Sequence, residues 1–256
     1  LNEDDRQLNT QRDLFNDPSE SGRVLPFNGQ SFFTLNRIEN TRLQQKVYKL
    51  NQLEYVLSKI NKDRDTYMSQ ALFNRPCRRS SHIGHITHAY VDLDLYKDAV
   101  FFESWMTKEQ IAQNILYFCE DNNIIPPSVI ISSGRGVYLK WYWSSPLPRQ
   151  VAGKAVAVNK ALVKLFQGWG ADPACVDMSR ILGVVGTINS KNNQPVVLLH
   201  QLQANGQPVT YDFESFADEV LPYTMEEINL FRQQAKDKSE RRQQVLLLSQ
   251  ERAKRH

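Results

Sequence analysis

Hydrophobic residues recur at every second position in some segments of the chain and at every third or fourth position in others, which is typical of strands and helices respectively. The clearest strand pattern runs from Tyr90 to Tyr96, where aliphatic and acidic residues alternate. Successive side chains of a strand point to opposite faces, so Asp92 and Asp94 would lie on one face, about 7 Å apart. The three aliphatic residues of this segment would enter the core from the other face.

The spacing of three and four predicts helices, and shorter apolar runs next to prolines and glycines predict further strands. The predicted helices span 36–63, 107–123 and 150–166, with a short one at 213–220 and another that begins at the capping box Thr224 to Glu227. Strands are predicted at 129–131 and in the segment that ends at Trp143. We expect Trp141 and Trp143 in the core rather than stacked on bases. A strand, a helix and another strand in succession indicate an α/β layer.

Length and composition describe a folded chain with one large domain. The chain has 256 residues, 41% of them hydrophobic, and no apolar run approaches the roughly 18 residues of a membrane span. Three cysteines without Cys-x-x-Cys spacing argue against a disulfide framework and favour a reducing cytoplasm. The start lacks a Met and a signal-peptide pattern, which is compatible with a fragment. We expect a flexible arm at 1–35, a core at 36–222 and a basic helix or linker at 223–256.

The two carboxylates of the segment Asp92-Leu-Asp94 indicate a metal site. Two like charges so close favour each other's protonation, and a divalent cation removes that conflict. Hard oxygen ligands suit Mg²⁺ or Mn²⁺. The same spacing also occurs in sugar-nucleotide transferases, in phosphatases and at solvated strand edges, so the spacing alone does not decide the chemistry.

A second polar motif, Ser-Ser-Gly-Arg-Gly at 132–136, occupies the turn between two predicted strands. Its two glycines would let backbone amides approach an anion closely, and Arg135 can bond a phosphate through two N–H groups. On the strand that follows, Lys140 would share a face with Tyr138 and Tyr142. These features favour an anion site over an ordinary hairpin with glycine at its turn.

A third polar motif follows the predicted helix at 150–166. Asp172 and Asp177 precede Arg180, and the segment Gly186 to Lys191 carries small polar groups and a lysine that can meet a triphosphate or a sugar. Two further carboxylates and two cations therefore follow the acidic strand along the chain.

Basic residues and histidines precede the acidic strand. Arg75, Arg78 and Arg79 form either a contact with a nucleic-acid backbone or a solvated loop, and we favour the contact. The histidines between 82 and 88 are three residues apart, which would bring them together only on a helix, whereas this segment runs into a strand. They also lack cysteine partners, so zinc is not predicted.

The three motifs in this order resemble those of the archaeo-eukaryotic primase superfamily, and more narrowly the RepB-type primases of plasmids and mobile elements and the related primase-polymerases. The shared pattern is Asp-x-Asp, then Ser-Gly-x-Gly before a strand, then Asp…Arg…Gly-Thr-x-Asn-x-Lys, and it spans about 66–199. The resemblance implies an α+β fold, in which helices flank a mixed or antiparallel RRM-like sheet and a helical C-terminal extension follows.

The resemblance also implies which residues act. Asp92 and Asp94 match the metal ligands of the first motif, and Asp172 matches the carboxylate of the third, with Asp177 in reserve. These carboxylates would hold two Mg²⁺ or Mn²⁺ ions. The residues implied in nucleotide binding are Ser133, Gly134, Arg135, Gly136, Tyr138, Lys140, Arg180, Thr187, Asn189 and Lys191.

The chain departs from the superfamily pattern in two motifs. The second motif often ends in a His that contacts the phosphates of the incoming nucleotide, and this chain has Tyr138 there. The final motif often has a second Arg and a Pro, where this chain has Gly183 and Val185. The cations that would have to compensate are Arg135, Lys140, Arg180 and Lys191.

The activity implied is template-directed nucleotidyl transfer that makes primers, and can extend them, in plasmid or mobile-element replication. The expected partners are single-stranded DNA, nucleoside triphosphates, and a replicative helicase or a further domain, with no membrane. The alternative is a replication-initiator module that binds DNA with weak or no catalysis, which Tyr138 and Gly183 leave open. A relaxase-type nuclease is a weaker third hypothesis, because it needs one residue between two histidines and His85-Ile-Thr-His88 has two.

Overall fold

The computed structural model describes residues 31–39, 42–95 and 106–221, together with Gln233, Lys236, Asp237 and Glu240. The chain divides into two units, Leu1–Val220 and Leu221–His256. The four isolated residues are helical and belong to the second unit, where the side chain of Gln233 donates a hydrogen bond of 2.9 Å to Asp237. The predictions for 1–30, for the capping box at Thr224 and for most of 223–256 lie outside the described residues.

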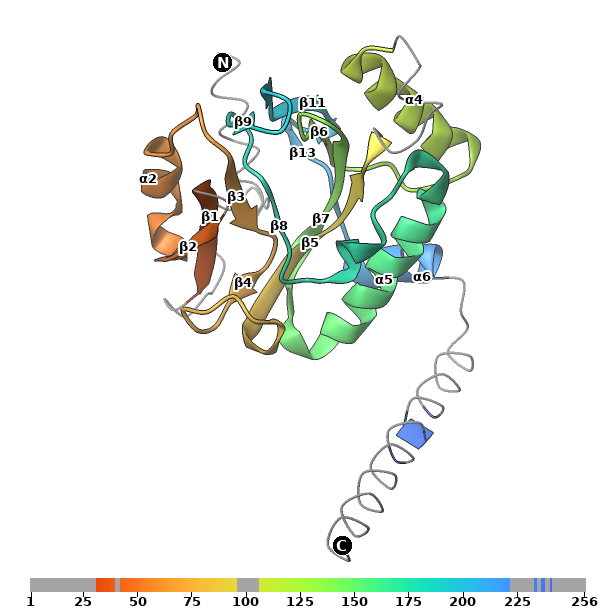
Figure 1. Ribbon diagram of the computed structural model, residues 1–256. Coiled ribbons are helices and arrows are strands. Elements are labelled where there is room, and N and C mark those ends of the chain that lie inside the picture. The colour runs from red at the N-terminus through yellow and green to blue at the C-terminus, as the bar shows by residue number, and fades with distance from the viewer. Residues whose placement is uncertain are drawn as a thin grey trace, which may run out of the picture. The chain divides into compact units, whose positions relative to one another are not determined.

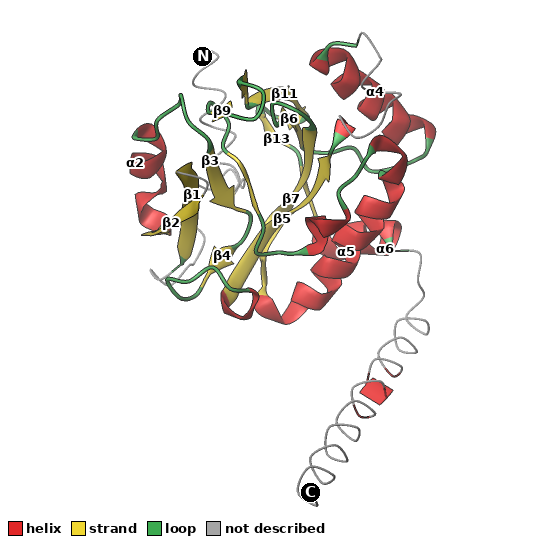
Figure 2. Cartoon of the chain, in the orientation of Figure 1, coloured by secondary structure: helices red, strands yellow, loops and turns green. Residues whose placement is uncertain are grey.

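The first unit combines strands with a few helices (Figure 2). Its longer strands are β1 (Phe32–Glu39), β2 (Arg42–Lys49), β3 (Thr66–Ser69), β5 (Ile83–Leu93), β6 (Val129–Ser132), β7 (Val137–Pro148) and β11 (Val197–Gln201). Its short strands are β4 (Leu72–Phe73), β8 (Ile181–Gly183), β9 (Ile188–Asn189), β10 (Gln194–Pro195), β12 (Gln203–Ala204), β13 (Gln207–Pro208) and β14 (Thr210–Tyr211). The described α-helices are α2 (Leu53–Ser58), α4 (Lys108–Asp121), α5 (Ala152–Leu165) and α6 (Phe213–Val220).

One mainly antiparallel sheet organises this unit (Figure 1). Its strand order is β11-β6-β7-β5-β4-β1-β3-β8, with β2 added beside β1 and β14 paired in parallel with β7. Helix α5 packs on β5, α6 packs on β7 and α4 contacts β11. Helices therefore flank a mixed sheet, which confirms the α+β fold that the sequence motifs implied.

The predicted helix at 36–63 is wrong over most of its length, because residues 32–49 form the β1–β2 hairpin. Both faces of β1 are buried here: Phe33 and Leu35 are 0% and 6% exposed, and Thr34 and Asn36 on the other face are 0% exposed. Helical structure begins only with the 3-10 turn Leu50–Gln52 and continues as α2, where the period of three and four does bury apolar side chains. The predicted arm at 1–35 also ends earlier than expected, since β1 starts at Phe32.

The other predicted helices in the described ranges are confirmed as α4, α5 and α6. At the start of α4, the hydroxyl of Thr107 accepts a hydrogen bond from the backbone N–H of Gln110, and the Gln110 side chain accepts one from the N–H of Thr107. Two backbone donors at the helix start are satisfied in this way. Among the residues the structure describes, no helix is long and apolar enough to cross a membrane.

The tryptophans of β7 belong to the core, as expected. Trp141 and Trp143 are 0% and 3% exposed, and the indole N–H of Trp141 donates to the backbone oxygen of Ile125. The ring of Trp143 meets the edges of Phe213 and Phe216 with centroids 5.1 Å apart. Aromatic packing therefore holds α6 against the sheet.

Candidate functional site

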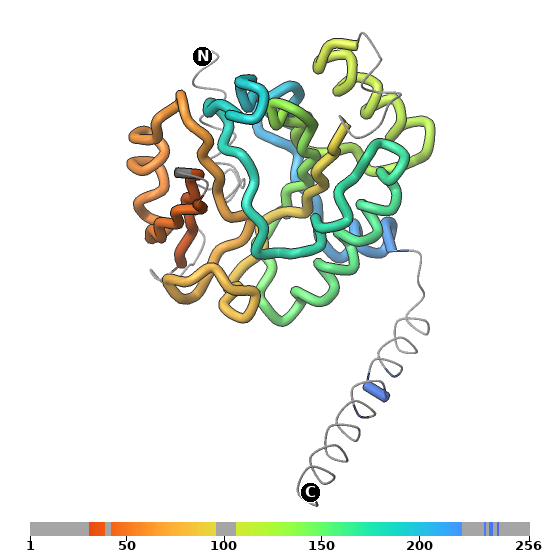
Figure 3. Tube along the Cα trace, in the orientation of Figure 1, coloured from red at the N-terminus to blue at the C-terminus, as the bar shows by residue number. Residues whose placement is uncertain are grey.

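Backbone pairing brings the first and third sequence motifs together at the end of β5. The N–H of Asp172 donates to the backbone oxygen of Asp92 at 2.8 Å, and the N–H of Asp94 donates to that of Gly170 at 2.9 Å. Leu93 and Ala171 form an antiparallel bridge between these bonds. Figure 3 shows the trace after α5 returning past β5 before it reaches β8. The position of Asp172 beside Asp92 is thus fixed by main-chain hydrogen bonds.

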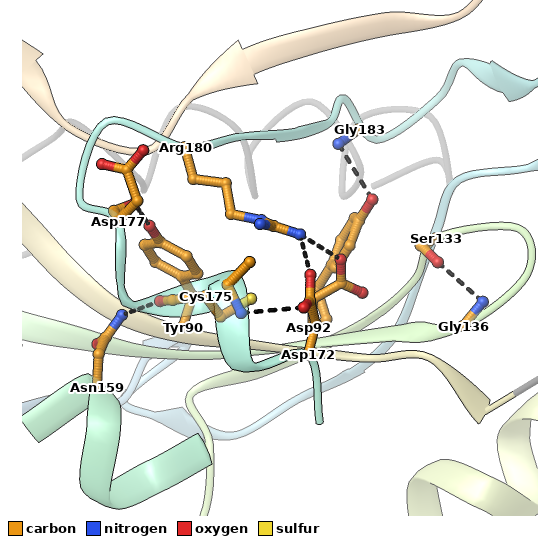
Figure 4. Close-up of polar contacts among 12 residues, drawn as sticks. Tyr90, Asp92, Ser133, Gly136, Asn159, Asp172, Cys175, Asp177, Arg180 and Gly183 are labelled. Atoms are coloured by element: carbon orange, nitrogen blue, oxygen red, sulfur yellow. Dashed lines mark hydrogen bonds and ion pairs between the residues drawn. The ribbon is translucent and has the colours of Figure 1, made fainter. Parts of the chain in front are cut away.

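The side chains of Asp92 and Asp172 lie around the guanidinium of Arg180 (Figure 4). Nη2 of Arg180 forms an ion pair with Asp172 and lies 3.6 Å from Oδ2 of Asp92. Ligand atoms of Asp92, Asp172 and Cys175 all lie within 4.8 Å of one another. Two carboxylates and a thiol therefore converge on one small volume.

The electrostatics of this cluster favour a cation. Burial raises the pKa of Asp92 to about 7, with a further contribution from the carboxylates of Asp94 and Asp172 and opposition from Arg180. Burial disfavours the charge of Arg180, but the neighbouring acidic groups outweigh that effect and its pKa is raised. Burial also raises the pKa of Cys175 to about 12, which keeps it a thiol. The carboxylate oxygens are the donors that fit Mg²⁺ or Mn²⁺.

The structure separates the two candidate carboxylates of the third motif. Whereas Asp172 lies beside Asp92, the carboxylate of Asp177 accepts hydrogen bonds from the backbone N–H of Ser179 at 2.9 Å and from its hydroxyl at 2.8 Å. The backbone oxygen of Asp177 accepts from the hydroxyl of Tyr90. Asp177 closes the turn before Arg180, and Figure 4 shows its carboxylate apart from the other two.

The turn between β6 and β7 lies against the end of β5. A Cβ atom at Gly136 would be 2.1 Å from the backbone oxygen of Leu93, so only glycine fits this contact. The amides of both glycines are already used: Gly136 donates to the Ser133 hydroxyl at 2.9 Å, and Gly134 donates to the Ser132 hydroxyl at 3.2 Å. The expected role of the two glycines is therefore corrected. They permit close packing, and their N–H groups do not point freely at an anion.

A lysine that the sequence motifs did not indicate also reaches this turn. Nζ of Lys108, the first residue of α4, donates to the backbone oxygen of Gly134 at 2.6 Å, and the same oxygen accepts from Asn192. Burial lowers the pKa of Lys108. Arg135 is exposed at the tip of the turn. The sequence held no signal for Lys108, because α4 meets the turn only through the fold.

The residues of the second and final motifs meet in a small pocket next to the carboxylates. Tyr138 lies opposite Asp92 in the β5–β7 register, and its phenol oxygen accepts a hydrogen bond of 3.3 Å from the N–H of Gly183. The pocket is lined by Asp65, Thr66, Tyr67, Ser133, Tyr138, Gly183, Thr187, Ile188, Asn189 and Val196. Four of the residues that the resemblance implied in nucleotide binding are therefore neighbours: Ser133, Tyr138, Thr187 and Asn189.

Asp65 organises one wall of this pocket, although the sequence indicated only the end of a helix there. It is 7% exposed, and its carboxylate accepts hydrogen bonds from the backbone N–H of Ser190 at 2.9 Å and from the Ser190 hydroxyl. The amide of Asn189 donates to the backbone oxygen of Ser133 at 2.7 Å, and its Oδ1 accepts from the N–H of Lys191. These bonds tie the final motif to the turn of the second.

Lys140 does not lie at the surface of the site, which corrects its expected role. It shares a face with Tyr138 and Tyr142, as predicted, but it is 1% exposed and its Nζ donates to Oε1 of Gln70 at 2.8 Å. The same oxygen lies 3.0 Å from Nε2 of His88, which is also buried. Burial lowers the pKa of Lys140 to about 7. The strand period predicted its face, while its burial against Gln70, 70 residues away along the chain, could not be foreseen.

The three arginines before β5 have different environments. Arg78 donates to the side chain of Gln45 at 2.9 Å and to the backbone oxygen of Ser179 at 2.7 Å. It therefore connects β2 with the turn that precedes Arg180. Arg75 and Arg79 are exposed.

Comparisons with known proteins agree with this geometry. No protein-family model matches the chain. A replication protein of Clostridium perfringens is 31% identical over 160 residues, which is 62% of this chain and 36% of that protein. The chain thus spans about a third of the length of this curated relative.

Three solved structures are similar to the chain, at sequence identities that show the fold alone. The AEP domain of the cyanophage S-2L primase-polymerase has a TM-score of 0.54 and 12% identity, covering 86% of this chain and 98% of that one. The catalytic domain of primase RepB′ in complex with initiator DNA has a TM-score of 0.52 and 12% identity, with coverages of 91% and 99%. A further structure of primase RepB′ has a TM-score of 0.50 and 14% identity, with coverages of 94% and 68%. The chain has the fold of archaeo-eukaryotic primase-polymerase catalytic domains, as its motifs indicated.

Proposed function

We propose that this chain catalyses template-directed nucleotidyl transfer and makes primers, which it can extend, on single-stranded DNA in plasmid or mobile-element replication. One observation carries the proposal: main-chain pairing places Asp172 beside Asp92 at the end of β5. A sheet edge with only a structural role gains no stability from bringing two carboxylates of distant motifs so close together, because like charges repel. Their convergence next to a polar pocket supports a catalytic centre.

The carboxylates of Asp92, Asp94 and Asp172 would hold the metal ions. When bound, two Mg²⁺ or Mn²⁺ ions lower the pKa of an attacking 3′-hydroxyl and stabilise the leaving pyrophosphate. The main-chain bonds between 170–172 and the end of β5 fix the spacing of these ligands. Fixed spacing matters because catalysis of this kind rests on positioning and charge neutralisation.

The pocket beside the carboxylates would take the incoming nucleotide. Ser133, Thr187 and Asn189 line it, and a sugar or a phosphate would exchange for their present internal hydrogen bonds, while Tyr138 forms the wall towards Asp92. The cations proposed for the phosphates are Arg135, Arg180 and Lys191, with Lys108 taking the place that sequence reasoning assigned to Lys140.

The template would bind near the basic residues of the first strands. Residues 31–80 contain ten lysines and arginines against four aspartates and glutamates, although the whole chain carries a net charge of only +3. Arg75 and Arg79 are exposed there, and Arg78 connects this region to the turn before Arg180. Such a local excess of cations favours a nucleic-acid backbone. A replicative helicase or a further domain is a proposed neighbour, because the curated relative is much longer.

A replication-initiator module with weak or no catalysis is the second candidate function. The observation that favours it is the pairing of Arg180 with Asp172 and Asp92, which occupies the oxygens that a catalytic metal would need. A solved relative in fold is described with initiator DNA bound.

Primer synthesis distinguishes the two functions. The chain is incubated with labelled nucleoside triphosphates and defined single-stranded templates in Mg²⁺ or Mn²⁺, as wild type and as Asp92→Asn or Asp172→Asn. We expect products from the wild type, none from the two variants, and wild-type yields from Asp218→Asn, which alters an exposed carboxylate of α6. Specific DNA binding by a wild type that never makes a product would overturn the proposal in favour of the initiator module.

A further inference from the structure

The guanidinium of Arg180 occupies the same oxygens that the proposed metal ions need. Its Nη2 pairs with Oδ2 of Asp172 and lies 3.6 Å from Oδ2 of Asp92, as Figure 4 shows. These are the carboxylates that converge with Cys175. A cation of the chain and a bound divalent ion therefore compete for one pair of ligands.

The main chain at Arg180 is held on both sides. Its N–H donates to the backbone oxygen of Asp177 at 3.0 Å, and its own oxygen accepts from the N–H of Gln70 at 2.9 Å. Strand β8 begins at the next residue. The guanidinium can consequently change partners by side-chain rotation alone, without moving the loop that carries it.

A divalent ion on the two carboxylates would leave Arg180 without these anionic partners. Its side chain is 25% exposed, and a partly buried cation is stable only when paired or well hydrogen-bonded. The guanidinium stays charged at all accessible pH values and presents five N–H donors, which match a carboxylate and a phosphate equally well. The group released by the metal is therefore suited to a phosphate.

We infer that Arg180 exchanges partners: it pairs with Asp92 and Asp172 in the absence of a divalent ion, competes with that ion for their oxygens, and turns to a nucleotide phosphate when the ion binds. The phosphate half of this exchange rests on the proposed function. The competition for the carboxylates rests on the contacts alone. By thermodynamic linkage, the divalent ion must raise the affinity of the chain for the nucleotide by the same factor by which the nucleotide raises the affinity for the ion.

Mn²⁺ binding to the full chain tests the competition, measured through the electron paramagnetic resonance signal of the free ion. Arg180→Gln removes the competing charge, so it should bind Mn²⁺ about fivefold or more tightly than wild type, within the usual range of couplings between sites. Arg180→Lys keeps a competing cation and should lie nearer to wild type. Arg78→Gln is the matched control, because it releases the same turn from Gln45 and Ser179 without taking a cation from a carboxylate.

The affinity for a non-hydrolysable nucleoside triphosphate tests the second half. Without Mn²⁺, wild type and Arg180→Gln should bind it about equally, since Arg180 is engaged with the carboxylates. With saturating Mn²⁺, wild type should bind it several-fold more tightly than Arg180→Gln. A variant that loses metal and nucleotide affinity together would show a purely structural role and overturn the inference.

A measurement on the unmodified chain covers the case in which Arg180→Gln does not fold. The guanidinium N–H signals of Arg180 in the NMR spectrum should change on addition of Mg²⁺ alone, and unchanged signals at saturating Mg²⁺ would refute the exchange. Primer synthesis is a separate readout. If the wild type makes no primers but Arg180→Gln binds Mn²⁺ more tightly, the proposed function is refuted and this inference stands. If the wild type makes primers but Arg180→Gln does not bind Mn²⁺ more tightly, the proposed function stands and this inference is refuted.

Discussion

The phenol oxygen of Tyr138 accepts a hydrogen bond of 3.3 Å from the backbone N–H of Gly183. These are two of the positions at which the chain departs from the primase motifs, and they contact each other across β7 and β8. A Cβ atom at Gly183 would lie 3.5 Å from the Tyr138 oxygen and 3.3 Å from Cγ2 of Val196. The phenol thus fills space that a longer side chain at 183 would need, so the two departures are one coupled change.

The coupling predicts a non-additive double-mutant cycle. Gly183→Arg should clash with Tyr138 and Val196, and Tyr138→His should leave the Gly183 N–H without its acceptor. In the double variant the smaller imidazole relieves the clash of the arginine with residue 138, so its loss of stability in urea unfolding should fall short of the summed single losses by about 0.5 kcal/mol or more. Strictly additive losses would mean that the two positions vary independently.

Close packing at Gly136 predicts a large effect of one added methyl group. Gly136→Ala places Cβ 2.1 Å from the Leu93 oxygen, so either the turn or the end of β5 must move. We expect a loss of about 2–3 kcal/mol in the free energy of unfolding, in the range of overpacked sites, and loss of primer synthesis. Gly153→Ala in α5, where a Cβ meets nothing within 4 Å, is the matched control and should be neutral or stabilising. Similar urea midpoints for the two variants would contradict this prediction.

Local sequence patterns predicted the helices and strands in which the period of apolar residues matches the buried face. They failed where the apolar residues of one segment fit both a helical and a strand period. Capping and spacing identified α4, α5 and α6, and the alternation of β5 placed Val91 and Leu93 in the core. Residues 36–49 of the hairpin fit a helix pattern because Leu43 and Val47 happen to lie four residues apart. In a hairpin the neighbouring strand decides the register, and no window of one segment contains that information.

The candidate site shows the same division. The motifs indicate Asp92 and Asp172 because they keep these residues in order along the chain, and the structure brings the two together; a metal-binding role for them and for Asp94 stays a prediction. Asp65 and Lys108 were missed because their roles arise from contacts with residues far along the chain, Ser190 and Gly134. Burial of a polar side chain depends on which loops cover a face, and single-sequence patterns do not encode this.

The bonds of Asp65 predict a defect in nucleotide binding. Asp65→Ala leaves the Ser190 N–H without an acceptor and loosens the segment 188–191, which carries Asn189 and Lys191. Ser190 is exposed, so water can replace the lost acceptor, and stability should fall only by about 1 kcal/mol, the net contribution of an ordinary hydrogen bond. The affinity for a fluorescent nucleoside triphosphate should fall several-fold, with a smaller effect on Mn²⁺ binding. Asp63→Ala, an exposed neighbour, should leave both affinities unchanged; equal effects of the two substitutions would exclude a specific role for Asp65.

Buried Lys140 predicts an unusual dependence of stability on pH. Burial lowers its pKa from 10.5 to about 7, so between these values the unfolded chain binds a proton that the folded chain does not. Stability is therefore lost as the pH falls from about 10.5 to about 7 and is gained as the pH rises through that window, by up to about 1.4 kcal/mol per pH unit. Below pH 7 both states carry the charge and this contribution is constant.

Substitution isolates this contribution from other groups that titrate in alkali, among them the buried thiols of Cys119 and Cys175, whose pKa values burial raises to about 12. Lys140→Met removes the titration, so the difference in unfolding free energy between wild type and Lys140→Met should change steadily from pH 7 to pH 10. The exposed Lys160 of α5 provides the control, and Lys160→Met should give a flat difference across the same range. A flat difference for Lys140→Met as well would show that the folded chain keeps Lys140 protonated, with Gln70 compensating its buried charge.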